Sequence, residues 1–353
     1  MIRIKARAPT ARGAVLPMLW GAAAVGYKVG CPLAQQDGLG ARIVTSAVFF
    51  AVGTGLVFHA RRALQRELRL ARRAADAAQN VVLRPLPPRL GGLDAAAAQL
   101  SADRGARVGG DLYEAVATEH GVRVVMGDVR GHGLAALGTV AALLGSFREA
   151  AHDEPDLGRV LRRLDRALAR HLRERARFEH PASGAPDPGA PVAEEFVTVL
   201  LLEIGGDGEL RALNCGHPWP YLISGASVEP LTGADPLPPL GPFPLPADLA
   251  AHECGRLPPG ASLVLFTDGA EDARDARGRF FSLPDALADA VRHHPVAPQA
   301  LLRTVFAALS EHTGGTPPDD VALLVLRDGR GREPAARDAG RPAASRPQPA
   351  RPG

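Results

Sequence analysis

Cysteine is scarce in this chain of 353 residues, which has only Cys31, Cys215 and Cys254. No two of them form a Cys-x-x-Cys pair, so the sequence offers neither a disulfide framework nor a cysteine-based zinc site. Tyr221 stands six residues after Cys215, where an enzyme that attacks phosphate with a cysteine needs an arginine. We therefore interpret Cys215 as a core residue.

Aromatic residues are also few, at 5% of the chain, and no basic helix carries them at intervals. The formal net charge is only +3, and the basic residues are grouped rather than spread. Residues 61–73 contain six arginines against one glutamate, and six more arginines follow Asp328. This grouping is typical of membrane topology and of a solvated tail, and it predicts no binding to nucleic acid.

Two apolar stretches lie near the N-terminus, at 14–33 and 43–58. Each is about 16–20 residues long, the short end of the range for a membrane span. Basic residues on both outer flanks predict that both termini lie in the cytoplasm. We expect a basic segment at 1–13 and a two-helix transmembrane hairpin at 14–60. Two buried soluble helices, or a signal peptide in place of the first span, are the alternatives.

A heptad-like repeat follows the second stretch, with small apolar residues spaced by four and three: Leu64, Leu68, Ala71, Ala75, Ala78 and Val82. This spacing predicts a linker helix at 61–83 that could pair two copies of the chain, although an unpaired helix would show the same pattern. Pro85 and the prolines at 87 and 88 predict its end.

The region 84–327 mixes strand and helix patterns, and we expect it to be one catalytic domain. Strand patterns lie at about 111–125, 196–204, 209–214, 262–267 and 321–327. Helical patterns lie at about 134–150, 157–175, 284–292 and 297–312. This order predicts an α+β fold of two antiparallel sheets with helices outside. The Arg/Pro/Ala-rich tail at 328–353 is predicted to be disordered.

Five aspartates lie beside glycines or at the ends of predicted strands: Asp111, Asp128, Asp268, Asp319 and Asp320. One Asp-Gly after a strand is usually only a turn, so the inference depends on their joint occurrence. A carboxylate at the end of a buried strand is held rigidly, and several brought together are costly unless cations neutralise them. The pattern therefore predicts a site for Mg²⁺ or Mn²⁺ between two sheets, without naming the reaction.

Six segments carry a family resemblance, in the order GGDLYEAV, GDVRGHGLAA, FVTVLLLEI, LNCGHPWPYLI, LVLFTDGAEDARDARGRFF and DDVALLVLR. Together they resemble the PPM-type (type 2C) serine/threonine protein phosphatases, and more narrowly the bacterial branch of sporulation stage II protein E. The resemblance covers nearly all of 84–327. It implies an α/β/β/α sandwich, which agrees with the order of predicted elements.

The resemblance also implies roles for the acidic residues. Asp128 would bridge two ions, Mn²⁺ or Mg²⁺, and the Val129 carbonyl would bind one of them. Asp268 and one member of the pair 319–320 would complete a metal shell, while Asp111 would act mainly through metal-bound water. A water bridging the metals would then attack phosphoserine or phosphothreonine in line, without a covalent intermediate.

Three further residues near these motifs have open roles. The arginine that holds phosphate in eukaryotic relatives has no clear match, and Arg130 is the candidate nearest to the acids. His132 could donate a proton to the leaving serine or threonine oxygen, or it could equally be a structural residue of the Gly-rich loop. His217, in the Asn-Cys-Gly-His motif, is interpreted as structural.

The resemblance implies a phosphorylated regulatory protein as substrate, specifically an anti-sigma-factor antagonist. With the hairpin, it predicts an enzyme of the cell membrane with two spans, a cytoplasmic catalytic domain and a possible homodimer through 61–83. The alternative is a catalytically weak, membrane-tethered module that binds phosphoproteins, for which the missing arginine is the best argument. A nucleotidyl cyclase also uses paired acids, but the Thr-Asp-Gly context argues against it.

Overall fold

The computed structural model describes residues 39–100, 109–131, 133–179, 195–231, 233–292, 297–315 and 317–330. The chain divides into two compact units, residues 1–77 and 78–353. The first predicted span at 14–33, the basic segment 1–13 and most of the predicted tail lie outside the described residues.

Helix α3 (Leu39–Val82) is a single helix of 44 residues. It contains both the second predicted span and the predicted linker helix, which the sequence had suggested as separate elements. Large apolar side chains of its first half are 38–77% exposed: Ile43, Val48, Phe50, Val52, Val57 and Phe58. The helix ends before Pro85, as the three prolines predict.

One helix of the described part, α4 (Leu134–Asp153), is long and apolar enough to cross a membrane. Half of its apolar window is buried inside the folded domain. Its buried residues include Leu143, Leu144 and Phe147, which belong to the main core. We therefore interpret α4 as a core helix, and the N-terminal hairpin stays a prediction.

The second unit contains two antiparallel sheets. One has the order β1-β2-β11-β10-β7-β8 and the other the order β3-β4-β5-β6-β9. The strands of the six-stranded sheet are β1 (Arg89–Leu90), β2 (Leu93–Leu100), β7 (Tyr221–Ser224), β8 (Ser227–Pro230), β10 (Ser262–Phe266) and β11 (Val321–Asp328). Those of the five-stranded sheet are β3 (Asp111–Thr118), β4 (Gly121–Val129), β5 (Val197–Ile204), β6 (Glu209–Cys215) and β9 (His252–Arg256).

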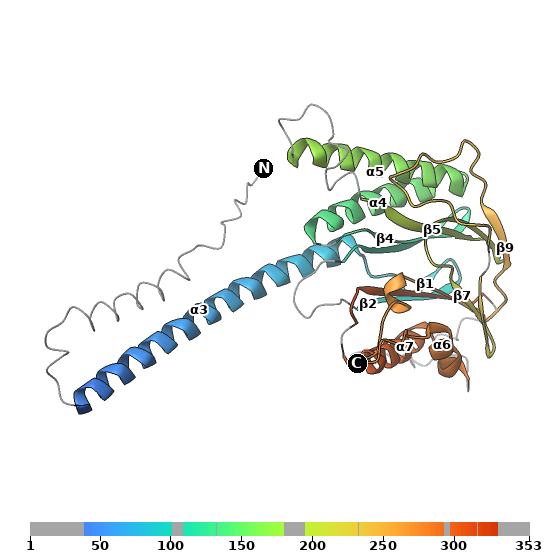
Figure 1. Cartoon of the computed structure of the whole chain (residues 1–353). Helices are drawn as coiled ribbons and strands as arrows, with labels where there is room; N and C mark the ends of the chain where they lie inside the picture. The colour runs from blue at the N-terminus through green and yellow to red at the C-terminus, as the bar shows by residue number, and fades with distance from the viewer. Residues whose placement is uncertain are drawn as a thin grey trace, which may run out of the picture. The chain divides into compact units, whose positions relative to one another are not determined.

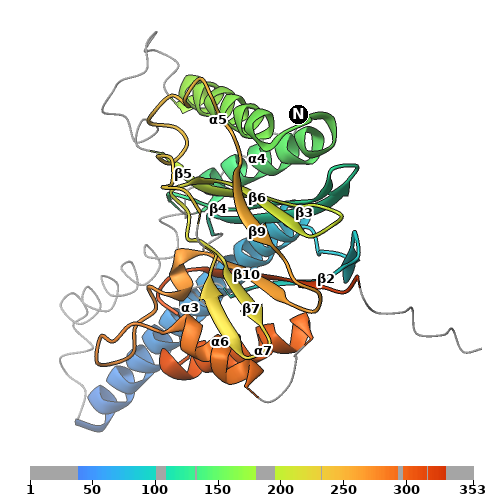
Figure 2. The same ribbon diagram turned by 90° about the vertical axis from the view of Figure 1, so that its right-hand side faces the viewer.

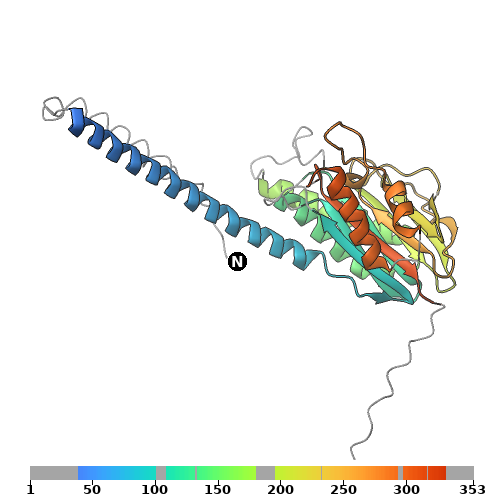
Figure 3. The same ribbon diagram turned by 90° about the horizontal axis from the view of Figure 1, so that it is seen from below.

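Helices cover the outer face of each sheet. Helix α4 and α5 (Leu157–Glu179) cover the five-stranded sheet, and α6 (Leu283–Val291) and α7 (Pro298–His312) cover the other (Figures 1 and 2). Figure 3 shows α7 lying across β2 and β11. This arrangement confirms the predicted pair of antiparallel sheets with helices outside.

The central strands explain the continuous apolar runs in the sequence. In β4 and β5 nearly every residue is buried, because a helix layer covers one face and the second sheet covers the other. Short turns join neighbouring strands, since β3 and β4 are connected at Glu119–His120 and β5 and β6 at 205–208. The sandwich thus places the ends of several buried strands along one edge between the sheets.

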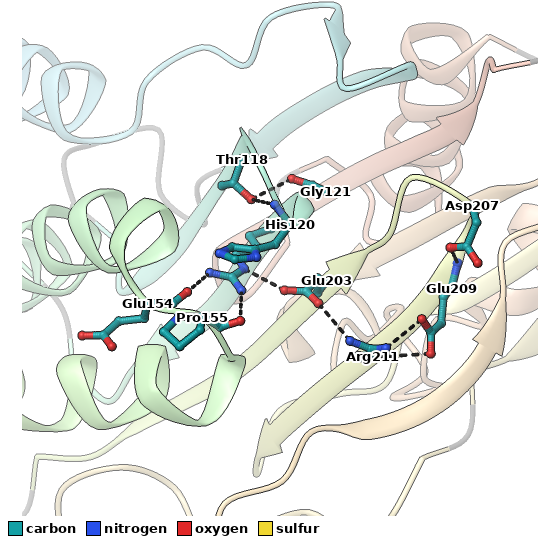
Figure 4. A network of polar contacts seen from close by, with 10 residues as sticks. Thr118, His120, Gly121, Glu154, Pro155, Glu203, Asp207, Glu209 and Arg211 are labelled. Carbon is teal, nitrogen blue, oxygen red and sulfur yellow. Dashed lines mark hydrogen bonds and ion pairs between the residues drawn. The ribbon is translucent and has the colours of Figure 1, made fainter.

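A buried arginine ties α4 to the five-stranded sheet. The Arg123 side chain is completely buried, and its Nε donates to Glu203 Oε2 at 2.8 Å. Its Nη atoms donate to the carbonyl oxygens of Ala151, Glu154 and Pro155, which would otherwise be unpaired at the end of α4. Glu154, Pro155 and Glu203, whose oxygen atoms accept these bonds, are labelled in Figure 4.

Candidate active site

Two of the predicted site residues face each other across neighbouring strands. Asp111 is the first residue of β3, and Asp128 is the last but one of β4. The two are paired in register, so their side chains lie on the same face of the sheet. The side chain of Asp111 is only 3% exposed.

The other three predicted acids come from the six-stranded sheet. Asp268 opens the short helix η2 (Asp268–Ala270) directly after β10, and the pair 319–320 directly precedes β11. Phe266 of β10 pairs with Leu323 of β11, so both segments lie at the same end of the sheet. A Cβ atom at Gly269 would lie 2.1 Å from the Asp320 carbonyl oxygen, which shows how closely the two segments approach.

Glycines bring the start of β3 against acids from both sheets. A Cβ atom at Gly109 would lie 2.4 Å from Asp320 Oδ2. One at Gly110 would lie 2.2 Å from the Val129 carbonyl oxygen and 2.7 Å from Asp128 Oδ1. Any larger residue at these positions would therefore displace groups that the sequence assigns to the metal site.

The electrostatics also show that the acids are neighbours. Burial raises the pKa of Asp111 well above its ordinary value, and repulsion from Asp128, Asp320 and Asp268 adds to that effect. Burial raises the pKa of Asp128 to about 7, with further repulsion from Asp268, Asp319 and Asp320. Each carboxylate is thus costly to ionise while the others are charged.

Asp268 behaves in the same way. Burial raises its pKa, and the charges of Asp272 and Asp319 raise it further. Asp272 follows Asp268 by one helical turn and was not among the predicted site residues. It is exposed, and the sequence marks it only as one of several acids in GAEDARD.

The donor set fits hard divalent cations by its chemistry. Carboxylate oxygens and the Val129 carbonyl are ligands that Mg²⁺ and Mn²⁺ prefer, and positive charge would relieve the mutual repulsion. Within the described residues, no three His, Cys, Asp or Glu side chains are grouped closely enough to enclose an ion by themselves. The acids therefore form two facing edges rather than a closed shell, and water would complete the coordination of an ion there.

Two polar side chains that sequence reasoning missed hold Asp111. Thr267 Oγ1 donates to Asp111 Oδ2 at 3.3 Å and accepts the Ala322 amide at 2.9 Å. Gln99 Nε2 lies 3.4 Å from the same carboxylate oxygen. Thr267 is completely buried, so its hydroxyl links the two sheets directly behind the acids.

A second missed group contacts Asp128. The Asp128 backbone amide donates to Thr198 Oγ1 at 3.2 Å, and Thr198 Oγ1 is hydrogen-bonded to His217 Nδ1 at 3.0 Å. Burial lowers the pKa of His217 to about 3. The His217 imidazole is therefore neutral near pH 7, which agrees with a structural role.

The two remaining predicted residues follow β4. Arg130 is exposed, and its guanidinium lies over the Phe196 ring at 5.2 Å from the centroid. Its backbone amide donates to the Phe196 carbonyl at 2.9 Å. His132 lies outside the described residues. Cys215 is buried, as expected, and burial raises its pKa to about 12, which makes it a poor nucleophile.

The chain matches the family model described as stage II sporulation protein E (SpoIIE) over residues 118–328. This match contains Asp128, Asp268 and the acid pair before β11, and it covers more than half of the chain.

Two solved structures have a similar fold. The first contains the RsbU and RsbW domains of a Mycobacterium tuberculosis protein, with 23% identity and a TM-score of 0.52. The match covers 71% of this chain and 62% of that one, so this chain spans less than two thirds of that relative. The second is the SiaA-PP2C domain of Pseudomonas aeruginosa, with 21% identity, a TM-score of 0.55 and coverage of 75% of this chain and 98% of that one.

Proposed function

The chain belongs to the stage II sporulation protein E (SpoIIE) family of metal-dependent phosphatases, and we propose that it hydrolyses phosphoserine or phosphothreonine on a regulatory protein. The observation that carries this proposal is the set of acidic residues at the meeting edges of the two sheets. Asp111 and Asp128 face Asp268 and the pair 319–320, and burial with mutual repulsion raises the pKa of the first three. Bound cations would neutralise this mutual repulsion, so such a set of carboxylates favours cation binding.

The residues that would hold two divalent ions are the five aspartates and the Val129 carbonyl. Bound ions would supply the positive charge and Lewis acidity that phosphoryl transfer to water requires. The chain itself fixes the carboxylates at strand ends and keeps Gly109 and Gly110 free of side chains. Both members of the acid pair lie near other acids of the set. The charge of Asp319 raises the pKa of Asp268, and the charge of Asp320 raises the pKa of Asp111.

Roles for Arg130 and His132 are part of the proposal. Arg130 lies two residues beyond Asp128 and is exposed, so its guanidinium could reach a phosphate at the edge of the site. Its stacking on Phe196 limits its freedom and would define where that phosphate sits. His132 is proposed to protonate the leaving oxygen, and His132→Gln tests this through loss of the alkaline limb of the pH–rate profile, where a general acid loses its proton.

The membrane arrangement is likewise proposed: two spans at 14–60, a linker helix at 61–83 that could form a homodimer, and a cytoplasmic domain at 84–327. The exposed apolar side chains between Ile43 and Phe58 support a span there, because an exposed apolar stretch of this length needs lipid or a protein partner. The arginines at 61–73 support its cytoplasmic end.

The substrate is proposed to be a phosphorylated anti-sigma-factor antagonist. One protein of similar fold joins an RsbU domain to an RsbW domain, which supports a regulatory protein as the partner. A general test substrate is p-nitrophenyl phosphate, which needs no protein recognition.

Turnover of p-nitrophenyl phosphate by the purified full chain tests the proposal. We expect hydrolysis that depends on Mn²⁺ or Mg²⁺, stops with EDTA and is lost in Asp128→Asn. A folded chain without metal-dependent turnover would contradict a phosphatase. If that chain still captured a phosphorylated partner after Asp128→Asn, the alternative of a phosphoprotein-binding module would replace it.

A further inference from the structure

A polar row crosses the five-stranded sheet at its catalytic end. Asp111 pairs with Asp128 in register, and Asp128 pairs with Thr198. Side chains paired in this way point to the same face of the sheet, here toward the facing sheet. Val199 of β5 pairs with Cys215, the last residue of the neighbouring strand β6, so His217 lies just beyond the same end of the sheet.

Hydrogen bonds link the row from Asp128 through Thr198 to His217. Thr198 Oγ1 accepts the Asp128 amide at 3.2 Å and is bonded to His217 Nδ1 at 3.0 Å. The hydroxyl therefore joins the backbone of a proposed metal ligand to an imidazole that is only 4% exposed. An apolar side chain at either place would fill the space without the cost of burying polar groups.

The imidazole is itself held by a closed turn. Asn214 Nδ2 donates to the His217 carbonyl at 2.8 Å, and the His217 amide donates to Asn214 Oδ1 at 2.8 Å. Gly216 between them has φ +68°, a left-handed conformation that favours glycine. The Asn-x-Gly-His motif thus fixes the ring in one orientation against Thr198.

We propose that Thr198 and His217 are positioning residues of the metal centre, and that they set its affinity for divalent cations by fixing the backbone at Asp128. This inference rests on the proposed function only in taking Asp128 as a metal ligand. Groups that orient metal ligands through hydrogen bonds commonly change metal affinity about 10–100-fold when they are removed. Because the imidazole is neutral, it adds no attraction or repulsion of its own to the cations.

Calorimetric titration of the purified full chain with MnCl₂ tests the proposal without reference to turnover. We expect Thr198→Val, which keeps the shape and loses the hydroxyl, to weaken Mn²⁺ binding about tenfold. Thr198→Ser keeps the hydroxyl and should bind nearly as the unaltered chain does.

Thr139→Val is the matched control. Thr139 of helix α4 is buried, whereas Thr198 is half-buried, and the Thr139 hydroxyl donates to Glu195 Oε1 at 2.6 Å. This variant should lower the melting temperature and leave Mn²⁺ affinity unchanged. Thr198→Val with unchanged Mn²⁺ affinity and a similar loss of melting temperature would overturn the proposal, since Thr198 would then be only structural.

His217 is tested by a second pair of variants. His217→Asn keeps a hydrogen-bonding group at the position of Nδ1 and should retain Mn²⁺ affinity, whereas His217→Leu should weaken it. The double variant Thr198→Val/His217→Leu should bind no more weakly than Thr198→Val, because both residues act through one contact. If His217→Leu does not fold, the Thr198 pair decides; if the unaltered chain binds no Mn²⁺, the proposed function fails first.

Discussion

At the residue scale, the carboxylates of the site oppose one another. Burial with repulsion from Asp268 and the acid pair raises the pKa of Asp128 to about 7. A carboxyl whose pKa is higher in the folded than in the unfolded state stabilises the fold at low pH and loses that effect as pH rises. In the absence of metal, ionisation of Asp128 between pH 4 and pH 7 therefore works against folding.

Asp128→Asn tests this balance in chain freed of metal by EDTA. We expect the variant to be more stable than the unaltered chain at pH 8 by roughly 1–2 kcal/mol, a value reduced for solvent screening. The difference should vanish near pH 4, and Mn²⁺ should raise the melting temperature of the unaltered chain more than that of the variant. Urea unfolding at both pH values measures it; equal stability at pH 8 would contradict the repulsion.

Gly110 gives a steric test at the same scale. A Cβ atom there would lie 2.2 Å from the Val129 carbonyl oxygen, so Gly110→Ala must displace a proposed metal ligand. We expect a loss of turnover on the order of 10²-fold, as for a misplacement of about 1 Å. Gly145→Ala in α4 meets no atom within 4 Å and should leave turnover unchanged. Equal turnover in the two variants would contradict the assignment of Val129.

Some residues of the site could be predicted because their sequence context is distinctive, and others could not. The acids beside glycines stand out because Asp128 and Asp268 lie at the ends of apolar runs and Asp111 follows two glycines at the start of a strand, and the structure brings these three together. Thr267 and Thr198 carry no such signal, since a threonine inside a strand is ordinary. Their roles depend on which strand lies opposite, and pairing between distant segments is not visible in the sequence.

At the element scale, covered strands and amphipathic helices were predictable, while weak patterns were not. Strand β2 has the sequence LDAAAAQL, and alanine has low strand propensity, so its pairing with β11 was missed. The short strands β7, β8 and β9 also lack alternation. The separate span and linker helix are one helix, α3, because no proline interrupts it and Gly53 and Gly55 do not end it.

The Arg123 cluster provides a prediction for element packing. Arg123→Met would leave the carbonyl oxygens at the end of α4 buried and unpaired, and would leave Glu203 only its longer ion pair with Arg211 at 3.8 Å. We expect a loss of about 3–5 kcal/mol in the free energy of unfolding. Arg211→Met removes an exposed arginine that pairs with Glu209 at 2.8 Å and with Glu203 at 3.8 Å. It should cost less than about 1 kcal/mol because Glu203 keeps its bond to Arg123. Chemical denaturation measures both; similar losses would contradict a special role for Arg123.

At the scale of the whole molecule, the chain combines two compact units, and in the first most of the described large apolar side chains are exposed. A phosphatase tethered to a membrane would act on partners near that surface. The two units can be separated by experiment, because the boundary lies within a helix rather than in a sheet.

Removal of residues 1–77 tests this organisation. We expect the remaining chain to stay in the soluble fraction of cells, to keep its secondary structure by circular dichroism and to bind Mn²⁺. The full chain should sediment with membranes and resist extraction at alkaline pH. A full chain found in the soluble fraction, or a shortened chain that aggregates, would contradict the membrane hairpin or the independence of the domain.

The number of Mn²⁺ ions bound per chain tests the central claim most directly, because it asks whether the facing acids hold cations at all. Calorimetric titration of the full chain should give two Mn²⁺ sites, with at least one lost in Asp128→Asn, the residue proposed to bind both ions. Equal stoichiometry and affinity in the two proteins would show that these carboxylates are neighbours without being a metal centre.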